Sequence, residues 1–431
     1  MTAPLLDGLR VVEVSAFVAA PIGGMTLAQL GADVIRIDPI GGNIDYRRWP
    51  LAPGGRSLYW TGLNKHKRSV ALDLRSDAGR DIARALITAP GEGGGILLTN
   101  LPASGWMGHE ELARDREDLI SLRLTGNYDG TPAVDYTVNC ASGFPAATGF
   151  GGPPVNHVLP AWDVAAGLYL SVGLLAADRA RRRTGTGREI ALSLSDVMLA
   201  TVANLGYVAD VQVNGAVRQP AGNEVYGAFG RDFETSDGRR VMVVAISNRQ
   251  WHALLRATAL TETFEAAGRA LGLDLDSEGG RYRARDMIAA LLKPWFAGRS
   301  LADVGDALSR EGVIWGPFQD FGQLVREDPR CSPRNPLFSL VEQPDVGQIL
   351  MPGSPLRPPP AEALPPKPAP RLGEDTEAVL SEMLGLSSAE IARLRAQGVV
   401  AGEPAAEQQE QGRNSEGTAV PAPGASVAGA P

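Results

Sequence analysis

The carboxylate of Asp163 occupies a position where a side chain can do chemistry. It lies between an apolar approach at residues 158–162 and an apolar stretch that begins at Val164. An aspartate placed this way is commonly the N-cap of the helix that follows. The alternative is a nucleophile at the edge of the core, which forms a covalent intermediate and so divides one difficult step into easier ones. We expect this side chain to be ionised at neutral pH, because the reference pKa of Asp is about 3.9. The residues alone leave both interpretations open.

A run of cations at residues 64–69, Asn-Lys-His-Lys-Arg-Ser, precedes a predicted strand. A solvated charged turn is the usual explanation for such a run. Phosphate binding is the sharper alternative, because ammonium and guanidinium groups are the usual phosphate partners in proteins. The run is therefore a second candidate for chemistry, this time with an anionic ligand.

The turn at residues 15–24 stands where a dinucleotide-binding protein would carry Gly-x-Gly-x-x-Gly, and it lacks that spacing. A hydride-transfer NAD enzyme is therefore disfavoured. The small residues of the turn still let a ligand approach the N-terminus of the next helix, which can attract an anion. Close packing of helix on sheet explains them equally well.

An alternation of strands and helices must position these side chains. Apolar runs predict strands at residues 8–14, 32–38, 69–74, 95–100, 119–124 and 189–194, with helices at 21–31, 78–87, 161–181 and 196–213. A strand, a helix and a strand within some thirty residues form a βαβ unit. This pattern predicts an α/β fold with a parallel, doubly wound sheet.

Turn-forming residues at 215–223 break the pattern and predict a domain boundary. The segment that follows has the pattern of a compact α+β module, with a hairpin at 229–244. We predict a first part of the large domain at 1–214, a small domain at 215–330 and a return segment at 331–402. Residues 403–431 have almost no large apolar side chain, so we expect a disordered tail.

Bulk composition excludes several classes of protein. The 431 residues are 44% hydrophobic and 21% charged, with a net charge of −8, which argues against a nucleic-acid partner. Cys140 and Cys331 are far apart, so neither a disulfide framework nor a zinc site is expected. We see no signal peptide and no apolar run near 18 residues. A cytoplasmic protein without a membrane partner or a bound metal is expected.

The order and wording of the segments resemble the class III CoA-transferases, the CaiB/BaiF type. The matching segments are residues 6–12, 28–37, 63–69, Asp163 with 167–169, 183–188, 235–238, 328–329 and 370–374. They span residues 5 to 400 in order. The resemblance implies a Rossmann-like large domain with a parallel sheet plus a smaller α+β domain, in an interlocked homodimer. It also implies an acyl-CoA substrate, no further cofactor, and Asp163 as the nucleophile.

The resemblance also supplies candidates for contacts with CoA and the acyl group. They are Phe17, Val18, Ala19, Arg36, Arg47, Arg48, Lys67, Leu72, Arg75, Asn100, Asp135, Gly143 and Arg231. For the free carboxylate of the substrate, Arg47, Arg48 and Arg231 are the cations of choice. Backbone amides near Gly143 or Gly222 are candidates for stabilising the oxyanion.

Residues 45–50, 134–139, 156–163 and 226–235 look closest to a branch of the family that moves CoA between the two carboxyl groups of one C5 dicarboxylate. The glycine-rich lid of other members is reduced to residues 221–224, which fits an enzyme that exchanges no acid. A transferase with a separate donor such as succinyl-CoA is the alternative. The racemases of this fold carry a His before the acid at Asp135, where this chain has Val134, so racemisation is disfavoured. A catalytically silent CoA-binding protein is a further alternative, which the retained Asp163 disfavours.

Overall fold

The computed structural model describes residues 3–356, 359 and 364–402, so the predicted tail at 403–431 lies outside the described residues. The chain divides into two compact units. The large unit combines Met1–Asp135, Pro160–Val197 and Pro336–Pro431, and the small unit combines Tyr136–Leu159 and Met198–Asn335. The domain ranges drawn from the sequence remain a prediction.

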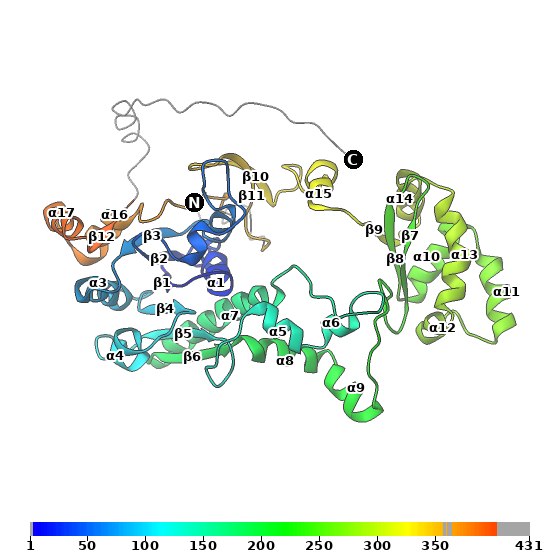
Figure 1. Ribbon diagram of the computed structural model, residues 1–431, viewed down its shortest axis with the longest axis horizontal. Coiled ribbons are helices and arrows are strands. Elements are labelled where there is room, and N and C mark those ends of the chain that lie inside the picture. The colour runs from blue at the N-terminus through cyan, green and yellow to red at the C-terminus, as the bar shows by residue number, and fades with distance from the viewer. Residues whose placement is uncertain (1–2, 357–358, 360–363, 403–431) are drawn as a thin grey trace, which may run out of the picture. The chain divides into compact units, whose positions relative to one another are not determined.

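A mixed α/β fold with a largely parallel sheet builds the large unit (Figure 1). Its strands run in the order β12-β3-β2-β1-β4-β5-β6. Their bounds are β1 Arg10–Val14, β2 Asp33–Pro39, β3 Arg68–Leu72, β4 Ile96–Thr99, β5 Ile120–Thr125, β6 Arg188–Ser193 and β12 Val400–Ala401. All neighbours pair in parallel except β12, which pairs antiparallel with β3. The six predicted strands are confirmed; the two-residue β12 was not predicted.

The strand order reverses between β1 and β4, which both continue into the loops at one edge of the sheet. In open α/β sheets ligands bind at this reversal, outside the carboxyl ends of the strands. Val14 on β1 lies opposite Thr99 on β4, and Ser15 and Asn100 follow them directly. The turn singled out in the sequence is therefore at the ligand-binding edge.

Helices cover both faces of the sheet. On one face, alternate strand residues such as Val12 and Val14 pack in one cluster with Leu86 of α3 (Asp77–Thr88) and Val379 of α16 (Thr376–Leu384). On the other face, α1 (Ala19–Ala28) packs against α7 (Ala161–Thr184). Burial on both faces explains why these strands are nearly continuous apolar runs.

Glycines let α1 and α7 approach each other closely. A Cβ on Gly167 of α7 would lie 2.6 Å from the carbonyl oxygen of Ala19, and one on Gly23 would lie 3.0 Å from the carbonyl oxygen of Gly167. The hydroxyl of Ser171 donates to the Gly23 carbonyl oxygen at 3.0 Å. Gly167 contacts Ala19 and, one turn later in both helices, Ser171 contacts Gly23, so the two helices run in the same direction. The N-terminal part of α7 therefore lies near the N-terminus of α1.

By length and composition alone α7 is long and apolar enough to cross a membrane, and so is the bent pair of α8 and α9. α7 packs on α1, β5 and β6 in the large unit. Its last turns hold a buried ion pair in which Arg181 donates to Asp178 at 2.6 Å. These contacts are those of a core helix in a folded domain.

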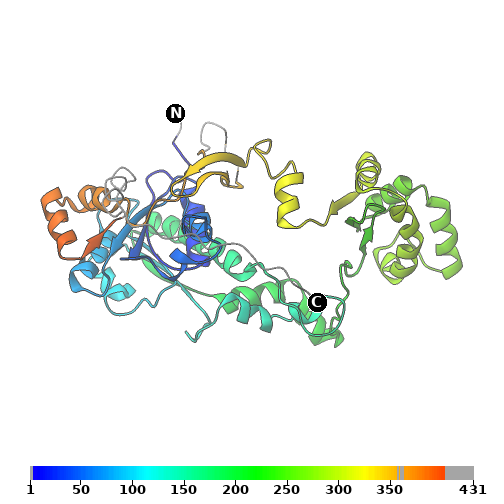
Figure 2. The same cartoon turned by 45° about the horizontal axis from the view of Figure 1, so that its top comes forward.

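The C-terminal segment returns to the edge of the large sheet, as Figures 1 and 2 show for α16, α17 (Ser388–Ala396) and β12 beside β3. The Asp375 carboxylate accepts the backbone N–H of Ser69 at 2.8 Å. The Ser69 hydroxyl in turn accepts the N–H of Gly373 at 2.9 Å. Residues near both ends of the chain therefore build one unit.

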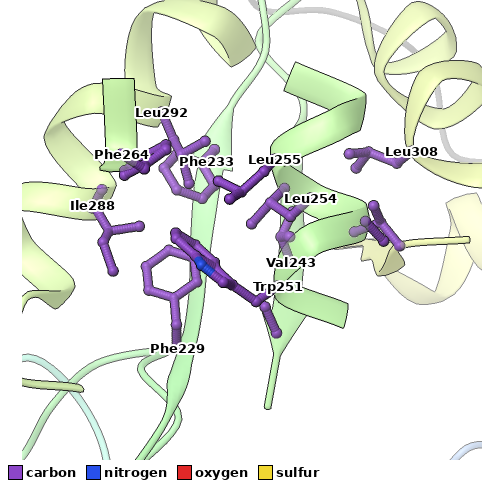
Figure 3. Close-up of a cluster of buried hydrophobic side chains, with 14 of the residues drawn as sticks. Phe229, Phe233, Val243, Trp251, Leu254, Leu255, Phe264, Ile288, Leu292 and Leu308 are labelled. Carbon is purple, nitrogen blue, oxygen red and sulfur yellow. The ribbon is translucent and has the colours of Figure 1, made fainter. Parts of the chain in front are cut away.

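The small unit packs helices on a three-stranded antiparallel sheet, which consists in spatial order of β7 (Phe229–Glu234), β8 (Arg240–Ala245) and β9 (Ile314–Pro317). Its core gathers aromatic and branched side chains from strands and helices (Figure 3). Phe233 stacks on Phe296 with ring centroids 4.3 Å apart, and Trp251 meets Phe264 edge to face at 5.2 Å. The predicted hairpin is confirmed as β7 and β8; the third strand, β9, was not predicted.

The prediction of one helix at 196–213 is wrong, because the segment forms two helices, α8 (Leu194–Asn204) and α9 (Tyr207–Asn214). Gly206 has a φ of 84°, which glycine adopts at little cost, and the chain bends by 56° there. The remaining bounds are as follows: α2 Leu58–Leu63, α4 His109–Ala113, α5 Asp135–Ala141, α6 Phe144–Ala147, β7 Phe229–Glu234, β8 Arg240–Ala245, α10 Asn248–Thr258, α11 Thr261–Leu271, α12 Glu278–Arg283, α13 Arg285–Ala297, α14 Leu301–Arg310, β9 Ile314–Pro317, α15 Phe321–Glu327, β10 Phe338–Gln343, β11 Gly347–Pro352, and the 3-10 turns η1 Ile44–Arg47 and η2 Gly105–Met107.

Candidate active site

Asp163 lies in the first turn of α7, where Pro160 and not Asp163 is the N-cap residue. The cap is supplied from elsewhere in the chain by Asp135. One carboxylate oxygen of Asp135 accepts the backbone N–H groups of Trp162 at 2.7 Å and of Asp163 at 3.0 Å. The side chain of Asp163 therefore does not cap the helix, which was one of the two interpretations of its position in the sequence.

The pKa of Asp163 is raised to about 7, first by burial and second by the nearby charge of Asp135. This changes the expectation that Asp163 is simply ionised at neutral pH. The carboxylate is poorly stabilised by its surroundings, so it is a stronger base and nucleophile than an ordinary Asp carboxylate when it is ionised. Such a perturbed group at the edge of a core marks a candidate functional site.

The second oxygen of Asp135 is buried and accepts no hydrogen bond within the described residues. Asp135 itself is almost fully buried, at 2% exposure. A buried carboxylate oxygen without a donor is costly, so the site holds Asp135 in a partly unsatisfied state. The sequence contained no local sign of this pairing, because the two residues meet only through the folding of the intervening loop.

The turn between β1 and α1 is held in a special conformation. Phe17 has a φ of 65°, which is rare for a bulky residue. Its N–H donates to the Asp45 carboxylate at 3.1 Å. Asn100 bonds both backbone groups of Ala16, accepting from its N–H at 2.9 Å and donating to its carbonyl at 2.7 Å. Phe17, Val18 and Ala19 are therefore positioned by fixed partners.

The start of α7 lies near the end of this turn. Gly167 packs against Ala19, the first residue of α1, and the two helices run in the same direction from there. Asp163 is one helical turn before Gly167, on the same side of α7. Asp163 therefore lies toward the end of α7 that is near the beginning of α1.

Arg36 is fully buried beneath the turn. Its guanidinium donates to Asp38 at 2.8 and 2.9 Å, to Asn64 at 2.9 Å and to Asp45 at 3.2 Å. Burial costs the charge some stability, but the surrounding carboxylates raise the pKa of Arg36 above its ordinary value. With its donors used inside the protein, Arg36 is not open to a CoA phosphate in this structure.

Lys67 is likewise enclosed. Its ammonium donates to Glu13 at 2.9 Å, to the Pro21 carbonyl at 2.9 Å and to Asn64 at 2.9 Å. Burial lowers its pKa to about 8, although Glu13 opposes the effect. Lys67 therefore supports α1 from within the protein, whereas Arg68 of the same run pairs with Asp33 on β2 and Glu382 on α16, both at 2.6 Å. The sequence did contain one sign of this arrangement, because Glu13 lies inside an apolar strand and a buried carboxylate needs a buried cation as its partner.

Other predicted contacts are exposed. Arg48 lies over the rings of Phe17 and Tyr59, at 5.7 and 5.2 Å from their centroids. Arg47 is exposed at the end of η1. The structure therefore brings Arg48 to the same turn as Phe17.

Leu72 is buried at the end of β3, while Arg75 is exposed and donates to Asp73 at 3.1 Å. Arg75 lines a cavity of about 600 Å³ at the carboxyl edge of β2 and β3. Arg395 lines the same cavity. The position of this cavity, at the carboxyl ends of parallel strands, is one at which nucleotide-bearing ligands commonly bind.

Gly143 and Arg231 belong to the small unit. Arg231 forms ion pairs with Asp286 at 2.8 Å and with Glu224 at 3.3 Å, so it already has carboxylate partners. The N–H of Gly222 donates to the Gly149 carbonyl at 2.7 Å, which removes it as a free oxyanion donor in this structure. Gly143 has a φ of 85° and begins α6.

Among the residues that the structure describes, no group of three or more His, Cys, Asp or Glu side chains is placed to hold a metal ion. The site instead offers a half-buried carboxyl group with a raised pKa, a second acid beside it, and a constrained turn at the carboxyl edge of a parallel sheet. This arrangement suits acyl transfer through a carboxylate.

The sequence profile of CoA-transferase family III matches residues 6–376, and the chain belongs to this family. A relative named 2-methylfumaryl-CoA isomerase, from Chloroflexus aurantiacus, is 54% identical over 401 residues, which are 92% of this chain and 98% of the relative. A succinyl-CoA:mesaconate CoA-transferase from Haloarcula hispanica is 28% identical, covering 82% of this chain and 89% of that one.

Solved structures share the fold. A CAIB/BAIF family protein from Brucella suis superposes with a TM-score of 0.72 at 24% identity, over 89% of this chain and all of that one. A protein from Mycobacterium tuberculosis gives a TM-score of 0.71 at 22% identity, over 88% of this chain and 99% of that one. At these identities the likeness concerns the fold.

Proposed function

We propose that the protein converts 2-methylfumaryl-CoA to 3-methylfumaryl-CoA by moving CoA between the two carboxyl groups of one C5 diacid. The observation that carries the proposal is the 54% identity to 2-methylfumaryl-CoA isomerase over nearly the whole of both chains. The raised pKa and burial of Asp163 supply the chemical basis, because the reaction needs a reactive carboxylate.

In the first half of the reaction, a carboxylate oxygen of Asp163 attacks the C1 thioester carbonyl. The carbon–sulfur bond breaks, which leaves a mixed anhydride and the CoA thiolate. The thiolate then attacks the Asp163 carbonyl carbon and breaks the anhydride. The products are an aspartyl-CoA thioester and free 2-methylfumarate, which stays in the site.

The second half repeats these steps at the other carboxyl group. The C4 carboxylate attacks the aspartyl thioester and releases the thiolate, which then attacks the C4 carbonyl and frees the Asp163 carboxylate. No proton or electron is gained or lost overall. Keeping the diacid bound makes this half effectively unimolecular, a gain of up to roughly 7–11 kcal/mol.

The residues around Asp163 have supporting roles in this scheme. Asp135 fixes the start of α7 through two backbone N–H groups. Asp45 and Asn100 hold the turn that carries Phe17 and Val18, against which the thioester would lie. We propose no metal or redox cofactor, since the steps are acyl transfers that the carboxylate and the thiolate complete by themselves.

An intermolecular transferase is the second candidate. Relatives such as the succinyl-CoA:mesaconate CoA-transferase are 28% identical over a similar length, so the fold serves that reaction as well. In that case a separate acyl-CoA would load CoA onto Asp163, and its acid would leave before the acceptor arrives.

We further propose that the protein works as a cytoplasmic homodimer. Large apolar side chains are exposed on α8, on α9 and in the link between them, including Leu199, Leu205 and Val211, each more than half exposed. Apolar side chains gathered in this way commonly mark an interface. Sedimentation should therefore report a dimer, and a monomer at micromolar concentration would contradict this part.

The direct test of the reaction is incubation of the purified protein with 2-methylfumaryl-CoA alone, followed by chromatographic separation of the two isomers. We expect the 3-methylfumaryl ester to form without any added acid or donor. Formation of product only when a second acyl-CoA or a free acid is supplied would favour the intermolecular reaction.

A further inference from the structure

The small unit contains a cavity of about 640 Å³ beside the segment 216–224. Pockets of this size commonly hold small organic ligands. Four arginines and two carboxylates line it: Arg218, Arg231, Arg240 and Arg285, with Glu224 and Asp232. The lining therefore has an excess of positive charge and is suited to an anion.

Three of the four arginines are already paired with carboxylates. Glu224 lies 3.3 Å from Arg231 and accepts from Arg285 at 2.8 Å. Arg240 donates to Asp232. The positive charges of these three guanidinium groups are largely neutralised by the carboxylates. They line the cavity but attract an anionic ligand only weakly.

Arg218 differs from the other three. Its guanidinium carbon lies 4.3 Å from the ring centroid of Tyr207 and 3.8 Å from that of Tyr226. Across the described ranges of the chain, no carboxylate forms an ion pair with it, and its buried Nε has no hydrogen-bond acceptor. A buried donor on a charged group is costly to leave unpaired.

The two rings that clamp Arg218 are themselves held in place. Phe144 meets Tyr207 edge to face at 5.3 Å, and Tyr282 lies 5.3 Å from Tyr226. Stacking occupies the faces of a guanidinium and leaves its edge, with the N–H donors, for a ligand. The donor fork of Arg matches the two oxygens of a carboxylate or a phosphate. Arg218 thus lines the cavity, is held between aromatic contacts and has a donor without an acceptor in the described part of the protein.

We propose that Arg218 is the anion-recognition residue of this cavity and binds the oxyanion of a carboxylate or of a phosphate ester. The choice of probes rests on the proposed function, whereas binding of the anion at Arg218 is measured without turnover.

The test compares the full-length wild type with Arg218→Gln by calorimetry, using three probes: CoA, pantetheine, which lacks the phosphates, and free 2-methylfumarate. Arg240→Gln is the matched control, because it removes the same charge from the same cavity at a compensated position. Tyr226→Leu is the second variant, since it keeps Arg218 but removes one clamping ring. Melting curves check that each variant is folded.

We expect Arg218→Gln to weaken one anionic probe by about tenfold or more, with pantetheine unaffected. Tyr226→Leu should weaken the same probe by less, and Arg218→Lys should recover part of the loss. Weaker CoA binding assigns Arg218 to a phosphate, and weaker 2-methylfumarate binding assigns it to the carboxylate. Unchanged affinity for both anions, or an equal loss in Arg240→Gln, would overturn the proposal. Absent isomerase activity in the wild type would overturn the proposed function and leave the binding result intact.

Discussion

The environment of Asp163 makes its carboxylate more reactive and, at the same time, makes the folded protein less stable when that carboxylate is ionised. Burial and the charge of Asp135 raise its pKa, so the ionised form is both more nucleophilic and less stable in the folded chain. Proteins commonly accept such a cost where chemistry requires it. Two predictions at this residue follow from the same pKa.

Asp163→Asn should abolish turnover and raise stability at pH 8. The folded-state pKa of about 7 exceeds the ordinary value of 3.8, so wild-type stability falls as the pH rises through this range. The neutral amide avoids that loss, and the melting temperature should rise by roughly 2–4 °C for each kcal/mol gained. At pH 4, where Asp163 is protonated, the two proteins should melt together. More than a few per cent residual activity would refute the covalent mechanism.

The pH profile of kcat/KM should show an acid limb near pH 7, because the free enzyme reacts only when Asp163 is ionised. Asp135→Asn should move that limb to lower pH, since it removes a negative charge while its amide oxygen can still accept the N–H groups of residues 162 and 163. Burial, the larger cause, remains, so the limb should stay above the ordinary Asp range. A limb that does not move would show that Asp135 acts only as a cap.

The sequence pattern singled out Asp163 as a candidate, because an acid between two apolar segments is visible locally, but it left the N-cap and the nucleophile interpretations both open. It could not reveal that Asp135 caps α7, since this contact joins residues 28 positions apart through a loop. The same holds for Arg36, whose buried partners Asp45 and Asn64 come from other segments of the chain, although Asp38 is a neighbour on the same strand. Contacts of this kind depend on tertiary structure and have no local signature.

At the scale of elements, the close crossing of α1 and α7 sets the position of the site. Gly167→Ala should therefore destabilise the fold by about 1–3 kcal/mol, because its Cβ would lie 2.6 Å from the backbone oxygen of Ala19. Gly173→Ala in the same helix is the control. Its Cβ would meet only the Leu122 side chain, at 3.4 Å, so it should be neutral or stabilising. Denaturant unfolding measures both, and equal effects would argue against the crossing as the constraint.

The strands of the large sheet were predictable, because buried parallel strands are short apolar runs bounded by turns. β9 and β12 were not predicted: β9 reads Ile-Trp-Gly-Pro, in which a glycine and a proline interrupt the strand pattern, and β12 has only two residues. The break between α8 and α9 had a local sign in Gly206, a glycine inside an apolar helical stretch. Its effect was underestimated because a helix tolerates an isolated glycine in many proteins.

At the scale of the whole molecule, family membership rests on residues 6–376, and residues 403–431 lie beyond that match. The tail lacks the apolar side chains needed to offset the entropy cost of ordering. Deletion of residues 403–431 should change neither the melting temperature nor kcat appreciably. A clear fall in either quantity would show that the tail contributes to the folded protein.

The central claim is that CoA moves within one bound diacid. Its most direct test is turnover of 2-methylfumaryl-CoA in the presence of isotopically labelled free 2-methylfumarate or succinate, with the label followed into the CoA esters. We predict that isomerisation proceeds while the esters stay unlabelled, because the released diacid remains in the site until CoA returns to it. Label that enters the esters at a rate comparable to turnover would contradict the claim and assign the protein to the intermolecular reaction.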